Sequence, residues 1–165
     1  MIIHASKEFA KRFKCEVGGA GHVVLQTGRL DAWSAHCFKI GRKSAVFFMS
    51  DATLYSVIIA TAGLRDFEAV FAAFLDRVAM KWRMEGVEFD PIDKSVILLP
   101  RSNRSLMSSM NEAIRCLTVH HQYVFDNDPD VDWSEYERML NWMPYKAINH
   151  DSPQRVLREM LRPEG

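Results

Sequence analysis

The sequence predicts an α+β protein: an antiparallel β-meander with helices packed mainly on one face, forming a single domain over residues 1–165. Two patterns carry this prediction. Apolar side chains alternate with a period of two from Trp33 to Ile40 and return in "SAVFFM", as expected for paired strands. Farther along, apolar residues recur at three- and four-residue steps over two long segments, as expected for helices that bury one face.

The strands follow from these patterns in chain order. "MIIH" is a short apolar start, and "HVVLQ" is a second short candidate inside a glycine-rich connection. "GRKS" (41–44) is a turn between the runs "WSAHCFKI" and "SAVFFM", so the two form a hairpin. "LYSVIIA" continues the meander, and its neighbour "AVFFM" is expected to be buried on both faces. A last strand, "KSVILLP", ends at Pro100.

The helices are marked by their caps. Ser6 and Asp66 are candidate N-caps, the second opening a stripe that runs from Phe67 to Trp82 and ends at Gly86. A long helix follows Pro100 and carries Leu106, Met110, Ile114, Leu117 and His121 on one stripe. Asp132 and Glu135 resemble a capping box, and Pro153 stands near the first turn of the last helix.

Composition argues against several classes of function, although a local basic patch for nucleic acid remains possible. Lys plus Arg and Asp plus Glu both number 21, so no global basic field supports nucleic-acid binding. No apolar stretch is long enough to cross a bilayer, and the start of the chain lacks a signal-peptide core. The three cysteines are scattered and lack a CxxC pair, which is typical of reduced thiols. We therefore expect a cytoplasmic protein that lacks contact with membranes.

The segment "PRSNRSLMSSMNEAIR" offers the clearest candidate site. A strand end followed by a helix start presents free backbone N–H groups, and Arg101, Arg104 and Ser105 could hold a phosphate or carboxylate there. The segment lacks the glycine spacing and lysine of a P-loop. The competing interpretation is that Ser102 or Ser105 only caps the helix while the arginines remain solvated.

Other chemistry has less support. His120 and His121 point about 100° apart on a helix, and no paired Cys/His spacing occurs, so we expect no metal site and no cofactor. Cys37 and His36 face opposite sides of a strand, so they do not form a nucleophile–base dyad. No motif in the chain is specific enough to name a reaction, and whether the protein is an enzyme is left open.

Aromatic residues near the C-terminal end suggest a different role. Trp133, Tyr136, Trp142 and Tyr145 could form a partner-binding surface, because Trp and Tyr dominate interface hot spots. The alternative is that they pack the short helix onto the body of the protein.

Several stretches together resemble a family of small bacterial proteins of unknown function. They are "MIIHASK", the hairpin "WSAHCFKIGRKSAVFFM", the helix start "NRSLMSSMNEA" and "LNWMP". The resemblance spans nearly the whole chain, with departures at Met107 and in the glycine-rich segment 18–21. It implies no activity, but it marks recurring polar and aromatic positions: His4, Lys7, Trp33, His36, Arg42, Asp51, Arg104, Ser105, Ser108 and Asn111. If Arg42 and Asp51 fold toward Arg104, these positions would share one polar pocket.

Two hypotheses follow. The first is a non-enzymatic binding or regulatory protein that acts through a protein partner or as a homo-oligomer. The second is an enzyme or sensor that binds a phosphorylated or carboxylated small molecule, or nucleic acid, with Arg42, Arg101, Arg104, Ser105 and Asn111 as the candidate anion ligands.

Overall fold

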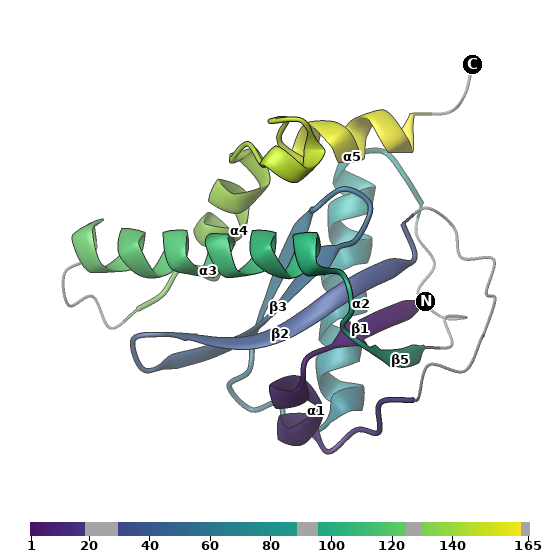
Figure 1. Ribbon diagram of the computed structural model, residues 1–165, viewed down its shortest axis with the longest axis vertical. Helices are drawn as coiled ribbons and strands as arrows, with labels where there is room; N and C mark the ends of the chain where they lie inside the picture. Colours follow the sequence, from purple (N-terminus) through teal and green to yellow (C-terminus); the bar gives the residue numbers. More distant parts are fainter. Residues whose placement is uncertain (19–29, 89–95, 125–129, 163–165) are drawn as a thin grey trace.

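A computed structural model describes residues 1–18, 30–88, 96–124 and 130–162 of the chain. The expected strand "HVVLQ" lies outside these ranges. The strands are β1 (Ile2–Ala5), β2 (Ala32–Ile40), β3 (Lys43–Ser50), β4 (Ser56–Ala60) and β5 (Ile97–Pro100). They form one five-stranded sheet in the order β4-β3-β2-β1-β5 (Figure 1).

The sheet is mixed, which corrects the prediction of an antiparallel meander. β2, β3 and β4 do pair antiparallel, with Cys37 opposite Val46 and Phe47 opposite Ile58. β1, however, pairs parallel with both β2 and β5. Parallel neighbours require a crossover connection, and the chain between β1 and β2 includes the helix α1 (Lys7–Phe13).

The helices begin largely where their caps predict. The remaining ones are α2 (Phe67–Met84), α3 (Arg104–Val124), α4 (Trp133–Trp142), the 3-10 turn η1 (Lys146–Ile148) and α5 (Pro153–Leu161). The side chains of Ser6, Asp66 and Asp132 each accept backbone N–H groups of their helices, as expected. For α3 the expected cap is wrong: the Asn103 side chain, and neither serine, accepts the N–H of Leu106 at 3.1 Å.

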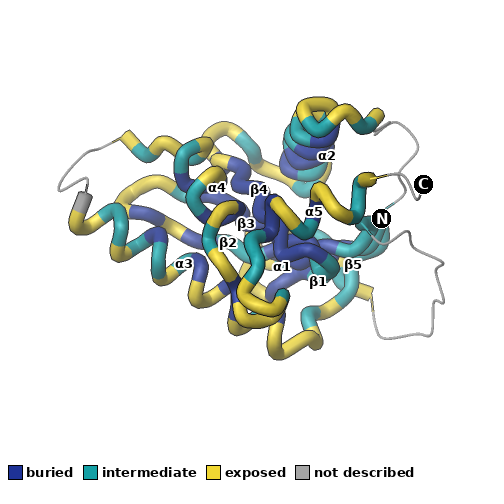
Figure 2. Tube along the Cα trace, turned by 90° about the horizontal axis from the view of Figure 1, so that it is seen from above, coloured by how far each residue is buried: buried dark blue, intermediate teal, exposed yellow. Residues whose placement is uncertain are grey.

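Two hydrophobic clusters lie on opposite faces of the sheet. Val46 and Phe48 of β3 belong to the cluster that α1, α2 and Leu157 of α5 cover. The alternate residues Phe47 and Met49 belong to the cluster that α3 and α4 cover. This alternation confirms that β3 is buried on both faces. Figure 2 shows α2 and α3 on either side of the buried strands.

The helix α4 closes the outer edge of β4. Asn141 accepts the N–H of Ser56 at 2.7 Å and donates its amide to the Ser56 carbonyl at 2.8 Å. One turn earlier, the fully buried Glu137 accepts the N–H of Ile58 at 3.0 Å. An edge strand otherwise presents unpaired backbone groups, so these two side chains take the place of a sixth strand.

Candidate functional site

Two of the predicted polar positions meet on the α3 face of the sheet. His4 of β1 lies beside Ser34 of β2 in the parallel register. The Nε2 atom of His4 is 3.4 Å from Oδ2 of Asp51, which follows β3. The Ser34 hydroxyl donates to Oδ1 of the same carboxylate at 3.0 Å. Burial raises the pKa of Asp51, whereas His4 and Ser34 act in the opposite direction by favouring the ionised form.

A second pair lies nearby, where β1 and β5 end. Burial and the adjacent Arg101 guanidinium lower the pKa of His36, which favours a neutral imidazole. Burial also lowers the pKa of Arg101, whose Nη1 donates to the sulfur of Met110 at 3.7 Å. The Nδ1 atoms of His4 and His36 are buried and have no hydrogen-bond partner within the described ranges. This region therefore holds the strongest concentration of the predicted residues.

Arg42 does not join this group. It lies in the turn between β2 and β3, whereas Asp51 follows the other end of β3, about 25 Å away at strand spacing. Its neighbour Gly41 lies next to His121 near the end of α3, far from Arg104 at the start of that helix. The hypothesis of a pocket shared by Arg42, Asp51 and Arg104 is therefore wrong.

The other predicted residues are dispersed. Arg104, Ser105, Ser108 and Asn111 are exposed along the first turns of α3, and Lys7 is exposed on α1. Trp33 is fully buried, with its ring 5.0 Å from that of Phe74 and its indole N–H bonded to the Leu30 carbonyl. The position of Trp33 is explained by packing in the core.

The aromatic group near the C-terminal end is mostly internal. Tyr136 and Tyr145 are buried, and half-buried Trp133 packs edge-on against Phe38. Trp142 is the exception, with 55% of its surface exposed. Three of these four side chains therefore pack the short helix onto the body of the protein, which was the alternative interpretation.

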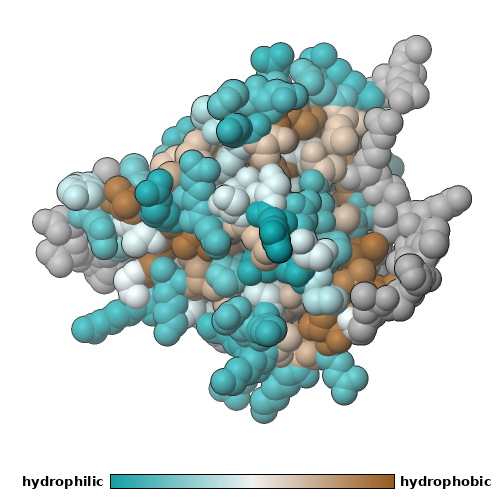
Figure 3. Space-filling view, in the orientation of Figure 1, coloured by the Kyte–Doolittle hydropathy of each residue, from teal (hydrophilic) through white to brown (hydrophobic). Residues whose placement is uncertain are grey.

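An apolar groove runs between α3 and α4. Its volume is about 550 Å³, and it is lined by Arg115, Cys116, Val119, His120, Tyr123, Met139 and Met143. Val119 and Tyr123 are 46% and 83% exposed, which is high for side chains of this size. Figure 3 shows hydrophobic residues interrupting the hydrophilic surface over α3. Most of the side chains that line the groove are apolar.

A comparison with protein-family models tests the family relationship that the sequence motifs suggested. The family model described as a domain of unknown function, DUF6933, matches residues 2–156. The chain belongs to the DUF6933 family. Searches of curated proteins and of solved structures found no match.

The DUF6933 match spans every strand and helix described above except the end of α5. Within the described ranges, no three His, Cys, Asp or Glu side chains gather as a metal ion would require. In the same ranges, no helix combines the length and the apolar character needed to cross a membrane.

The sequence did contain a signal for the groove, which was missed. Cys116, Val119 and Tyr123 recur at steps of three and four residues, beside the stripe formed by Leu106, Met110 and Leu117. Only the second stripe is continuous enough to predict a core-facing side of the helix. Glu137 and Asn141 gave no signal, because a charged and a polar residue on a helix are normally assigned to its solvated face.

Proposed function

We propose that this protein is a non-enzymatic binding protein that docks a partner protein in the groove between α3 and α4. The observation that carries the proposal is the exposure of Val119 and Tyr123 along that groove. Exposed apolar patches with a polar rim are typical of interaction sites, and here Arg115 and His120 provide polar groups beside the apolar ones.

The chemistry of the groove favours the apolar face of an amphipathic helix as the occupant. Two helices form its walls, and a third helix can pack between such walls with side chains at three- and four-residue steps. Met139 and Met143 supply flexible, polarisable surface that adapts to different partners.

Enzymatic roles have less support from the geometry. The Cys37 side chain packs against the cluster on the α2 face, whereas His36 faces the other side of the same strand. Burial raises the pKa of the Cys37 thiol to about 11, so very little thiolate is present at neutral pH. Cys37 is therefore a poor nucleophile at neutral pH.

The test uses two lysine variants on exposed helix positions. Val119→Lys places a charge in the groove, and Met80→Lys places one at a 40% exposed position of α2 that does not line it. We expect Val119→Lys to lose a partner captured from the native host, or to lose self-association measured by light scattering, while Met80→Lys retains it. Equal behaviour of the two variants, or a strict monomer that captures no protein, would contradict the proposal.

A second hypothesis, an anion site at the start of α3, is supported by Arg101 alone. Its half-buried guanidinium bonds to a thioether, so several of its N–H donors lack an acceptor within the described part of the chain. Arg104 and Ser105, in contrast, are exposed. Phosphate should raise the melting temperature of the wild type and not of Arg101→Gln; equal shifts in both would exclude this site.

A further inference from the structure

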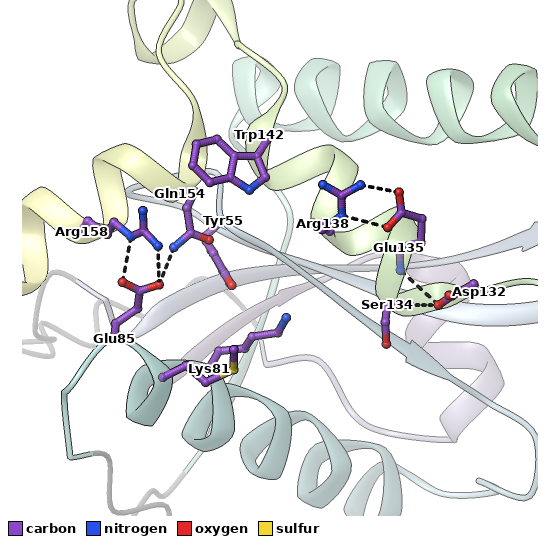
Figure 4. Close-up of a pocket in the computed structure, with 11 residues that line it drawn as sticks. Tyr55, Lys81, Glu85, Asp132, Ser134, Glu135, Arg138, Trp142, Gln154 and Arg158 are labelled. Carbon is purple, nitrogen blue, oxygen red and sulfur yellow. Dashed lines mark hydrogen bonds and ion pairs between the residues drawn. The ribbon is translucent and has the colours of Figure 1, made fainter.

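A separate cavity lies on the other side of α4, independent of the proposed partner groove. Its volume is about 410 Å³, and its walls come from the end of α2, from α4 and from α5. Figure 4 shows Tyr55 in the middle of the labelled side chains, with Trp142 above it, Lys81 below it, and Arg158 and Arg138 to either side. A cavity of this size is large enough for a small organic ligand.

The Tyr55 hydroxyl places a polar group at the base of the cavity. The residue is only 3% exposed, yet it lines the cavity. Its ring is held in place edge-on against Trp82, with 5.7 Å between centroids. Burial, followed by the charges of Glu137 and Glu85, raises the pKa of Tyr55, so the hydroxyl stays protonated and can donate.

The acceptors around Tyr55 are already engaged. Both oxygens of Glu85 accept from Arg158, and one also accepts from Gln154 at 2.8 Å. Both oxygens of Glu135 accept from Arg138. Asp132 caps α4 by accepting two backbone N–H groups. The lining carboxylates are therefore already bound to donors of the protein itself.

Donors, in contrast, are in surplus. Arg138 and Arg158 each bind their carboxylate through Nε and Nη2, which leaves Nη1 without a partner in the described ranges. Lys81 makes one ion pair, to the buried Glu137 at 2.8 Å, although an ammonium group has three donors. A ligand that satisfies these groups and Tyr55 must itself be rich in acceptors.

Two further features narrow the chemical class of the ligand. Trp142 lines the cavity and is 55% exposed, with the Arg158 guanidinium 5.8 Å from its ring centroid, so it offers a surface for a planar group. The lining cations Lys81, Arg138 and Arg158 are matched in number by the carboxylates Glu85, Asp132 and Glu135. Because Lys81 is already paired with the buried Glu137, the lining has no excess positive charge to compensate a dianion such as phosphate.

From these contacts we infer that the cavity between α2, α4 and α5 binds a small planar carboxylate, with its ring against Trp142 and its carboxylate accepting from Tyr55 and the neighbouring cations. No covalent step is involved. The site is distinct from the α3–α4 groove and does not depend on it.

The experiment distinguishes recognition of the aromatic ring from recognition of the negative charge. Tryptophan fluorescence and thermal unfolding are followed on the full chain with benzoate, benzyl alcohol, acetate and inorganic phosphate at equal concentrations. We expect saturable binding and a raised melting temperature with benzoate alone. Equal effects of all four probes, or no effect of benzoate, would overturn the inference.

Matched variants locate the site. Tyr55→Phe removes only the hydroxyl and should raise the benzoate dissociation constant about tenfold or more, as expected for a lost hydrogen bond to a charged group. Tyr145→Phe removes a hydroxyl that is equally buried on the other side of the sheet and should leave it unchanged. Trp142→Leu should weaken binding, and Trp142→Phe should restore most of it. Equal affinity in Tyr55→Phe and the wild type would place benzoate elsewhere and end the proposal.

Discussion

At the scale of single residues, the buried tyrosines show how a hydroxyl can cost or contribute stability. The Tyr136 hydroxyl and His121 Nδ1 are 2.9 Å apart and share a hydrogen bond. The Tyr145 hydroxyl is buried and has no partner in the described part of the chain. An unpaired buried polar group is unfavourable relative to its hydrated state in the unfolded chain.

Tyr145→Phe should therefore stabilise the protein by about 1 kcal/mol, because it removes an unsatisfied group without changing the shape of the core. Tyr136→Phe, the matched control, should destabilise it by a similar amount because it breaks a hydrogen bond. Denaturant unfolding measures both. A loss of stability in Tyr145→Phe as large as that in Tyr136→Phe would show that the first hydroxyl is also paired.

The cysteines give a prediction about pH. Burial raises the pKa of Cys37 to about 11, so about one molecule in a thousand carries this thiolate at pH 8. Cys116 lines the open groove between α3 and α4. At pH 8 iodoacetamide should modify Cys116 first, and the rate at Cys37 should rise about tenfold per pH unit toward pH 11. Peptide mass spectrometry resolves the two sites; equal rates at pH 8 would contradict the burial of Cys37.

At the scale of elements, local patterns in the sequence predicted what they could determine. The hairpin of β2 and β3 follows from alternation across a short turn, and the caps at Ser6 and Asp66 act within one helical turn. The parallel pairing of β1 with β5 joins residues about 95 positions apart, such as Ile2 and Ile97. No local pattern encodes such a partner, since it depends on how α1 and α2 cross the sheet.

The attachment of α4 to β4 can be tested by a change of similar volume. Asn141→Leu leaves the N–H and the carbonyl of Ser56 buried without partners, so we expect a loss of about 2–4 kcal/mol. Asn111→Leu on the exposed side of α3 is the control and should change stability by less than about 0.5 kcal/mol. Similar values for the two variants in denaturant unfolding would mean that Asn141 does not hold the strand edge.

At the scale of the whole molecule, α4 connects three parts of the structure. Glu137 and Asn141 hold the edge of β4, and Met139 and Met143 form one wall of the groove with α3. Glu135, Arg138 and Trp142 form one wall of the cavity around Tyr55. These three sets occupy different sides of one ten-residue helix. Both proposed binding surfaces therefore depend on how firmly α4 is docked.

The sequence predicts only part of the candidate site, because local patterns do not encode which distant residues meet. His4 and Asp51 are far apart in the sequence, and the sheet brings Nε2 of His4 to 3.4 Å from Oδ2 of Asp51. Arg42 does not meet them, because the eight residues of β3 separate it from Asp51. Motif positions identify residues of interest, but only the strand register decides which of them meet.

Native-state hydrogen exchange of the β4 amides tests the docking of α4 most directly. Neighbouring amides of a strand point to opposite edges, so Val57 and Ile59 face β3 whereas Ser56 and Ile58 face α4. If Asn141 and Glu137 hold this edge, Ser56 and Ile58 should be protected as strongly as Val57 and Ile59. Rapid exchange at Ser56 and Ile58 beside slow exchange at Val57 and Ile59 would show that α4 leaves the edge open, and would contradict the account.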